Sequence, residues 1–308
     1  MKDWISAARL RTLPLSLSGI VMGSFLARWK LKTVGGVWDV RIFTWAVIVT
    51  LLYQILSNYA NDYGDGVKGT DHARNAKAEV RAVSSGKISA EAMRKAVFFF
   101  SLLSFFASIV LLCTAFTPFS RAFFIFTGLG ILCILTAIGY TMGKKPYGYY
   151  GLGDLMVFIF FGGVSVIGSY YLFTKSLDLD IILPASAVGF MSVAVLNLNN
   201  MRDLHSDRLS GKKTLALRLG YKNAMIYEMV LLQLPLIFIL IFLGLENFFQ
   251  IGKYYPFIVM VLYLPLARVR KNILSTKEPE NLDLFLKHVS IITFMMSVLL
   301  AFGLNYFD

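Results

Sequence analysis

The chain has 308 residues, 57% of them hydrophobic, and a mean hydropathy of +0.66. Soluble domains of this size are less apolar, so the composition excludes a soluble globular enzyme and indicates a protein that lies mostly in a lipid bilayer. The net charge of +12 would also fit a nucleic-acid-binding protein. However, the cations lie between long apolar runs, so no nucleic-acid partner is expected.

Nine long runs contain no charged residue: Leu13–Ala27, Ile42–Asn61, Ala96–Phe119, Ala122–Ile138, Leu155–Phe173, Ile181–Asn200, Met229–Leu245, Tyr254–Ala267 and Val289–Tyr306. A helix needs roughly 17–25 mostly apolar residues to cross a bilayer, so most of these runs can span it. Two runs are short, and one of them contains Pro256 and Pro265, which predict a kink. We therefore predict an all-α polytopic membrane protein with nine transmembrane helices, in which residues 1–308 form a single domain.

The lysines and arginines are divided unequally between the two sides of the predicted helix bundle. Of the 30, 23 fall in the amino-terminal segment or in loops on its side. By the positive-inside rule this side is cytoplasmic, so the amino terminus is predicted inside and, after nine crossings, the carboxyl terminus outside. The short termini and the lack of a recognisable transit peptide favour a bacterial cytoplasmic membrane.

The first polar cluster reads NYANDYGDGVKGTD, begins at Asn58 and follows directly on an uncharged run. Acidic residues at the edge of a membrane span are costly and are typical of a functional site. In a helix, Asn58, Asp62 and Asp65 would share a face, and Asn61 would lie one turn before Asp65. The glycines that follow weaken the helix. Asp71 is therefore predicted to come from a loop that folds back.

The second polar cluster reads NNMRDLHSD, begins at Asn199 and follows another uncharged run. Asn199, Asp203 and Asp207 are spaced i, i+4 and i+8, which on a continuous helix places them on one face. The topology puts both clusters at cytoplasmic helix ends. A single Asp at a helix end is often a cap or an interfacial charge, but two Asn/Asp clusters on the same side indicate one shared site.

Carboxylate and carboxamide oxygens are hard ligands that suit Mg²⁺, which keeps part of its water shell and shares phosphate oxygens. Two groups of such ligands on facing helices can hold Mg²⁺ ions against a diphosphate, and the metal then stabilises the departing diphosphate. A leaving diphosphate in a membrane enzyme implies an activated lipid. The two cysteines and three histidines show no metal-binding spacing. The Gly- and Tyr-rich loop Gly139–Asp154 fits a structural or a functional role equally well.

Several strings resemble the UbiA superfamily of intramembrane prenyltransferases. NDYGDGVKGTD and NNMRDLHSDRLSGKKTLALRLG look like its two Asp-rich motifs. RLRTLPLS, RAVSSGKIS and YTMGKKPYGYYGLGD look like its 1,4-dihydroxy-2-naphthoate polyprenyltransferase branch, and the likeness covers nearly the whole chain. In the 4-hydroxybenzoate branch the last two Asp of the first motif are typically spaced D-x-x-x-D, whereas here five residues separate Asp65 from Asp71.

The resemblance implies nine helices around a central lateral cavity, and it implies roles for individual residues. The implied ligands of Mg²⁺ and diphosphate are Asn61, Asp65, Asp71, Asn199, Asp203 and Asp207, with Asp62 nearby; Asp65, Asp203 and Asp207 would be catalytic. The residues implied to grip the diphosphate or to shape the cap of the site are Arg81, Tyr140, Arg202 and Lys145, or Lys144 beside it. Asn58 would face the acceptor ring.

The implied reaction transfers a polyprenyl group from polyprenyl diphosphate to 1,4-dihydroxy-2-naphthoate. Loss of CO₂ then gives demethylmenaquinol, a step of menaquinone biosynthesis. The two substrates and the lipid bilayer are the expected partners, and no protein partner is required.

Three alternatives stay open from the residues. Within the superfamily, the acceptor could be another aromatic acid such as 4-hydroxybenzoate. A CDP-alcohol phosphotransferase shares the opening of its D-x-x-D-G-x-x-A-R motif with Asp62, Asp65 and Gly66, but positions 69–70 are Gly-Thr instead of Ala-Arg. A secondary transporter would carry its acidic residues near mid-span, not at the helix ends.

The charge distribution predicts the outcome of reporter fusions. A reporter that is active only outside the cytoplasm should be active when fused after Asp308 and silent when inserted beside Lys212. The reverse pattern of activity would refute both the topology and the cytoplasmic placement of the two Asp clusters.

Overall fold

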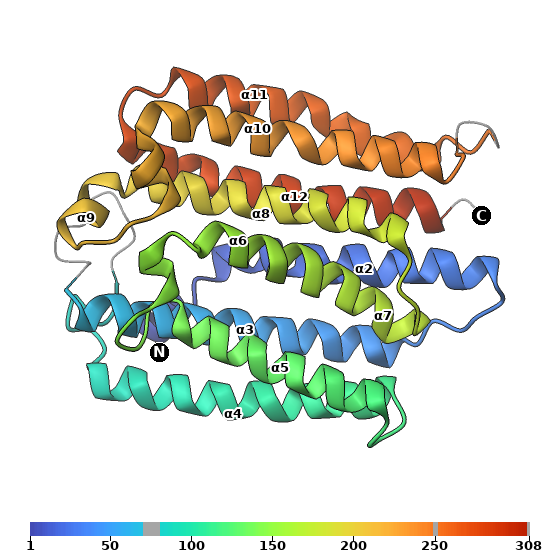
Figure 1. The fold of residues 1–308 in the computed structure, drawn as a ribbon, viewed down its shortest axis with the longest axis horizontal. Helices are drawn as coiled ribbons and strands as arrows, with labels where there is room; N and C mark the ends of the chain where they lie inside the picture. Colours follow the sequence, from blue (N-terminus) through green and yellow to red (C-terminus); the bar gives the residue numbers. More distant parts are fainter. Residues whose placement is uncertain (70–80, 249–251, 307–308) are drawn as a thin grey trace.

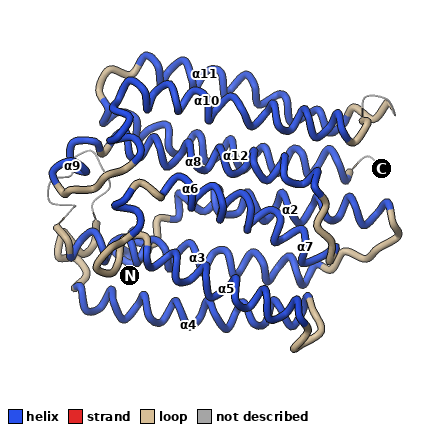
Figure 2. The backbone as a smooth tube through the Cα atoms, in the orientation of Figure 1, coloured by secondary structure: helices blue, strands red, loops and turns tan. Residues whose placement is uncertain are grey.

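The structure is a computed structural model that describes residues 1–69, 81–248 and 252–306. Its backbone forms a bundle of helices whose connections lie at the two ends of the bundle (Figures 1 and 2). No β-strand occurs in these three ranges, which confirms the all-α class. The long helices are α2 (Leu13–Thr33), α3 (Val40–Val67), α4 (Ala90–Ala115), α5 (Arg121–Gly139), α8 (Ile182–Arg202), α10 (Leu215–Leu245) and α12 (Asp283–Asn305). Of these, α10 is kinked at Gly220, whose φ is 73°.

The remaining helical segments are short or continue one another. One continuous helix is made of α6 (Gly153–Val157), the π-helical segment η4 (Phe158–Gly168) and α7 (Ser169–Thr174). A 3₁₀ segment, η6 (Tyr255–Leu262), leads into α11 (Tyr263–Ser275). The short connecting helices are α1 (Lys2–Ala7), η1 (Leu10–Thr12), η3 (Tyr147–Tyr150), η5 (Leu179–Ile181), α9 (Leu204–Leu209) and η7 (Pro279–Leu282).

Within the described ranges, eight helices are long and apolar enough to cross a membrane. They correspond to eight of the nine predicted runs. The other run, Tyr254–Ala267, begins with η6 before it becomes α-helical. The count of nine stays a prediction, as does the orientation of the amino terminus. The chain starts at one end of the bundle and α12 finishes at the other (Figure 1), as an odd number of crossings requires.

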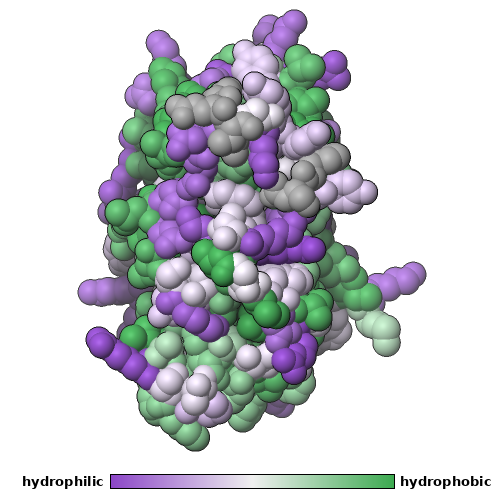
Figure 3. All heavy atoms as spheres, turned by 90° about the vertical axis from the view of Figure 1, so that its right-hand side faces the viewer, coloured by the Kyte–Doolittle hydropathy of each residue, from purple (hydrophilic) through white to green (hydrophobic). Residues whose placement is uncertain are grey.

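Large apolar side chains cover the outer helices. Phe98, Phe99 and Phe106 on α4 and Phe124 and Leu135 on α5 are each more than half exposed. Such a surface is unfavourable in water and favourable against lipid tails. At the end of the bundle where α12 finishes, hydrophilic side chains are spread over the face and several project from its rim (Figure 3). The protein is therefore a multi-pass membrane protein.

Helix α2 packs closely against the helix made of α6, η4 and α7. A Cβ added at Gly23 would lie 2.1 Å from the carbonyl oxygen of Val166. Small residues that let two backbones approach are typical of helix pairs in membranes, where van der Waals contact replaces the hydrophobic effect. This packing forms one wall of the interior.

Helices α8 and α10 are joined by a buried polar contact. The Asn197 side-chain amide donates to the Ala224 carbonyl (3.0 Å) and to Glu228 Oε2 (2.9 Å). Asn197 and Glu228 are both fully buried. A buried polar group is costly without a hydrogen-bond partner, so this contact fixes the register of α8 against α10. It thereby sets the position of the carboxyl end of α8, where the second polar cluster begins.

Removal of this contact should destabilise the protein. Asn197→Ala leaves the buried Glu228 without its donor, so we expect a loss of roughly 2–3 kcal/mol and a lower thermal unfolding midpoint in detergent. The matched control is Asn223→Ala, because Asn223 is exposed on α10 and bonds to the carbonyl of Leu219 in its own helix. Equal unfolding midpoints for the two variants would contradict the role given to Asn197.

Candidate active site

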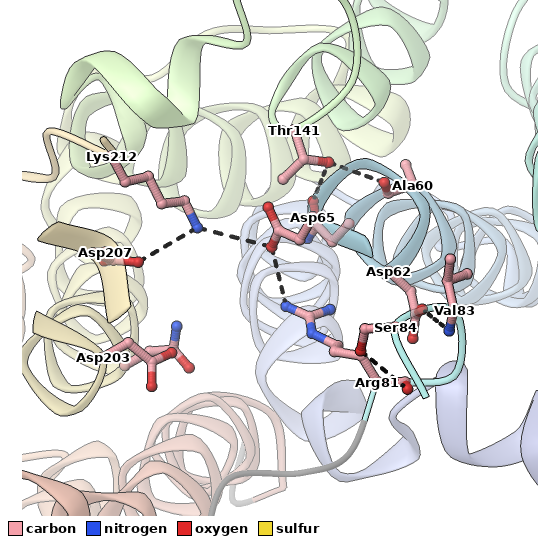
Figure 4. A network of polar contacts seen from close by, with 12 residues as sticks. Ala60, Asp62, Asp65, Arg81, Val83, Ser84, Thr141, Asp203, Asp207 and Lys212 are labelled. Atoms are coloured by element: carbon pink, nitrogen blue, oxygen red, sulfur yellow. Dashed lines mark hydrogen bonds and ion pairs between the residues drawn. The ribbon is translucent and has the colours of Figure 1, made fainter. Parts of the chain in front are cut away.

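The two polar clusters meet at one end of the bundle. Residues 58–67 of the first form the last three turns of α3, and the second spans the end of α8 and the short helix α9. Figure 4 shows Asp65 and Asp207 on either side of the Lys212 ammonium, with Asp203 on the same side as Asp207. Side chains about 140 residues apart in the sequence thus share one site, as the sequence indicates.

The second cluster is not one continuous helix. Helix α8 ends at Arg202, and Asp203 is its C-cap, with φ −93° and ψ 11°, before α9 begins at Leu204. The expectation that Asn199, Asp203 and Asp207 share one helical face was therefore wrong. Backbone hydrogen bonds still join the three residues across this break, from the Asp203 N–H to the Asn199 carbonyl (3.1 Å) and from the Asp207 N–H to the Asp203 carbonyl (2.9 Å).

Asp65 is contacted by side chains from three separate segments of the chain. It is 3% exposed. Its Oδ1 accepts a hydrogen bond from the Tyr149 hydroxyl (2.9 Å), and its Oδ2 lies 3.4 Å from Arg81 Nη2 and 3.8 Å from Lys212 Nζ. A buried carboxylate needs such donors and cations around it.

Asp62 differs from Asp65 in its hydrogen-bond donors, which are backbone N–H groups. It is 1% exposed, and its two oxygens accept the backbone N–H groups of Ala82 (3.0 Å) and Val83 (2.8 Å). These bonds hold the segment after residue 80 against α3, which places the buried Arg81 beside Asp65 (Figure 4). The contacts of Asp62 are thus those of a residue that positions Arg81, and its role as a metal ligand stays a prediction.

The turn after α5 packs directly on the end of α3. The Thr141 hydroxyl lies 2.9 Å from the Ala60 carbonyl oxygen and 3.2 Å from Asn61 Oδ1. Only a glycine fits opposite it, because a Cβ at Gly64 would lie 2.6 Å from Thr141 Oγ1. The helix therefore continues through Gly64 instead of ending there.

Arg202 places one positive charge within the second cluster. It is 5% exposed. Its Nε and Nη2 donate to the two oxygens of Asp203 (2.7 and 2.6 Å), and Nη2 also donates to Asn199 Oδ1 (2.7 Å). Its Nη1 donates to Asp283 in the first turn of α12, and Asp283 also lies 3.6 Å from Arg11. The guanidinium therefore links α8 and α12, with Asp283 connecting both to the amino-terminal segment.

Tyr149, Lys212 and Lys68 belong to the site although the sequence analysis did not select them. The Tyr149 ring centroid lies 5.1 Å from Lys212 Nζ and 4.7 Å from Lys68 Nζ. Burial lowers the pKa of the Lys68 ammonium, and the nearby Asp65 opposes this shift. The abundance of Gly, Tyr and Lys in the loop Gly139–Asp154 was the one available signal for Tyr149.

A cavity of about 370 Å³ begins next to the site and runs into the bundle. Asn58, Asn61 and Tyr140 line it together with apolar residues such as Phe126 and Leu172. Burial, followed by the Asp65 carboxylate, raises the pKa of the Tyr140 phenol well above its usual range. Ligand pockets are typically of this kind, mostly apolar with a few polar groups at fixed places.

The other predicted site residues are placed as follows. Asn58 lines the cavity and donates through Nδ2 to the Ala8 carbonyl (2.8 Å). Lys145 is exposed in the turn after α5 and takes part in none of the contacts above. Asp71 lies outside the described residues, so its place in the site stays a prediction.

The donors at the site suit a hard cation that is shared with a ligand. The candidate ligand oxygens are those of Asn61, Asp65, Asn199, Asp203 and Asp207, and all of these residues already take part in polar contacts within the protein. Among the described residues, no three His, Cys, Asp or Glu side chains are close enough together to hold one metal ion. The carboxylates come from different elements, Asp65 from α3 and Asp207 from α9. Mg²⁺ is commonly bound in this manner, through one or two carboxylates, water and substrate phosphates.

Comparison with known proteins agrees with this geometry. The profile of the UbiA prenyltransferase family matches residues 20–304. The chain belongs to this family. It is 38% identical over 305 residues to the 1,4-dihydroxy-2-naphthoate octaprenyltransferase of Haemophilus influenzae, with 99% of this chain and 96% of the relative covered. Its identity to the enzyme of the same name from Escherichia coli strain K12 is 38% over 276 residues, with 90% and 86% covered.

A solved structure shows the same fold. The structure described as an apo form of a UbiA homolog from Aeropyrum pernix K1 superimposes with a TM-score of 0.65 over 94% of this chain and 99% of that one, at 16% identity. Family membership makes the chain a prenyltransferase, and the phosphotransferase and transporter alternatives are set aside.

Proposed function

We propose that the protein is a 1,4-dihydroxy-2-naphthoate polyprenyltransferase. The observation that carries the proposal is the 38% identity over 99% of the chain to a curated enzyme of this activity. The two carboxylate clusters support it, since Asn58 and Asn61 of the first cluster also line a mostly apolar cavity. We place the enzyme in a bacterial cytoplasmic membrane with the site on the cytoplasmic side, and we retain the prediction that residues 1–308 form one domain.

The polar site would bind the diphosphate of the donor substrate, and the cavity would bind its prenyl chain. The diphosphate would lie among the polar residues, where Arg81, Lys212 and Arg202 supply positive charge next to the carboxylates. Divalent ions, in our proposal Mg²⁺, would be held by Asn61, Asp65, Asn199, Asp203 and Asp207. When bound there, they neutralise the charge that develops on the departing diphosphate. The polyprenyl chain would extend along the apolar part of the cavity.

The reaction breaks the C–O bond between the first prenyl carbon and the diphosphate, which takes the electron pair. The ring carbon of the acceptor that bears the carboxylate forms the new C–C bond, and the C–C bond to the carboxylate then breaks to release CO₂. Asn58 lines the cavity, as does Asn61. In our proposal, Asn58 would face the aromatic ring of the acceptor. The apolar lining keeps water from the allylic cation, which water would otherwise capture.

The proposal predicts which carboxylates serve the ions. Asp65→Asn and Asp203→Asn should each lower turnover on the order of a hundredfold without a comparable loss of expression or thermal stability. Chelation should abolish turnover, and added Mg²⁺ should restore it in the wild type. Glu91→Gln is the matched control, because Glu91 is exposed on α4 and pairs with Lys95. Near-normal turnover in either Asp variant would remove that residue from the metal-binding set.

The acceptor is tested by the fate of its carboxyl carbon. Purified protein with Mg²⁺, polyprenyl diphosphate and carboxyl-labelled 1,4-dihydroxy-2-naphthoate should release one labelled CO₂ per prenylated product, with little turnover of 4-hydroxybenzoate. A prenylated product that keeps the label would refute the position of attack. Preference for 4-hydroxybenzoate would refute the acceptor and leave the metal site standing.

A further inference from the structure

Lys212 lies between the two carboxylate clusters. Its Nζ is 3.8 Å from Asp65 Oδ2 on α3 and 3.9 Å from Asp207 Oδ1 on α9, and its side chain is 12% exposed. Figure 4 shows the ammonium extending between the two carboxylates. Lys212 thus contacts one carboxylate of each cluster.

The backbone around Lys212 is anchored by hydrogen bonds, whereas its ammonium makes longer contacts with the two carboxylates. The Lys212 N–H donates to the Asp207 carbonyl, and the Lys213 N–H donates to the Tyr149 carbonyl, both at 2.9 Å. From this fixed base a four-carbon stem carries the ammonium past the ring of Tyr149. A lysine stem has several rotatable bonds, so the charge can move while the backbone stays in place.

The Lys212 ammonium balances the negative charge of Asp65 and Asp207 without forming a close hydrogen-bonded pair with either carboxylate. Both Nζ to oxygen distances are longer than a hydrogen bond. By contrast, Arg202 holds Asp203 through two hydrogen bonds of 2.7 and 2.6 Å. Asp65 and Asp207 are each 3% exposed, and two such buried carboxylates repel unless a cation lies near them. A divalent ion at the same carboxylates would supply that charge and repel the ammonium.

We propose that Lys212 is a tethered counter-ion of the metal site: it joins Asp65 to Asp207 when no divalent ion is bound, and it leaves them when one binds. This inference rests on the metal site of the proposed function. It adds that a residue of the chain itself competes with the metal and so sets the concentration at which the site fills. Before substrate binds, the ammonium of Lys212 would hold the two carboxylate clusters together.

The test uses full-length protein in detergent without substrate, with Mn²⁺ as the binding probe. Lys212→Met removes the charge and keeps most of the stem. Lys213→Met is the matched control, because Lys213 is adjacent and its side chain is exposed. Mn²⁺ affinity is measured by titration calorimetry, and thermal unfolding is followed once in chelator and once in saturating Mg²⁺.

The proposal makes two linked predictions. Without the competing ammonium, Lys212→Met should bind Mn²⁺ roughly 5- to 20-fold more tightly than the wild type. In chelator, its unfolding midpoint should fall by about 3 °C or more, and saturating Mg²⁺ should remove this difference. Lys213→Met should match the wild type in both measurements.

Other outcomes would overturn the proposal. Unchanged or weaker Mn²⁺ binding by Lys212→Met would mean that the ammonium does not compete with the metal. An equal loss of stability in chelator and in Mg²⁺ would leave Lys212 with a structural role only. If the wild type binds no Mn²⁺ without substrate, the exchange proposed for Lys212 fails, whereas the metal site shared with the diphosphate is judged by the turnover of Asp65→Asn and Asp203→Asn. If the wild type binds Mn²⁺ and Lys212→Met binds it with the same affinity, only the role proposed for Lys212 is overturned.

Discussion

A carboxylate buried at the end of a membrane helix has to be surrounded by positive charge and hydrogen-bond donors from other parts of the chain. For Asp65 these come from three segments, through the hydroxyl of Tyr149, the guanidinium of Arg81 and the ammonium of Lys212. The need to satisfy this one group therefore draws together the end of α3, the segment after residue 80, the turn before α6 and the segment after α9. Asp203 has the same need, and Arg202 meets it from within α8.

The contacts that satisfy the carboxylates also prepare the site for an anionic ligand. The cations that balance the carboxylates are available to a diphosphate once divalent ions take over the carboxylate oxygens. Such preorganised charge costs no rearrangement of the protein at the moment when the diphosphate leaves. The apolar cavity begins at Asn61 and Tyr140, next to these charges. A lipid diphosphate fits this division, with its charged group at the helix ends and its chain inside the bundle.

Local sequence information predicted the helices and the two clusters, because apolar runs and Asn/Asp groups are visible without tertiary contacts. It could not predict the break at Asp203, since a periodicity of four residues continues past the point where the chain turns. Tyr149 and Lys212 were missed for another reason: each lies in a connecting segment, and only the packing of that segment brings its side chain to Asp65. Asp283 was not selected from the sequence, because its contact with the buried Arg202 depends on how α12 packs against α8.

The central claim is that carboxylates from the two clusters hold divalent ions around one diphosphate. A crystal structure with Mn²⁺ and a non-cleavable polyprenyl diphosphate analogue tests it most directly, through the anomalous scattering of the metal. The account predicts anomalous peaks within about 2.1 Å of carboxylate or amide oxygens from both clusters, Asp65 on one side and Asp203 or Asp207 on the other, with diphosphate oxygens completing the coordination. Metal peaks confined to one cluster, or a diphosphate bound away from both, would contradict it.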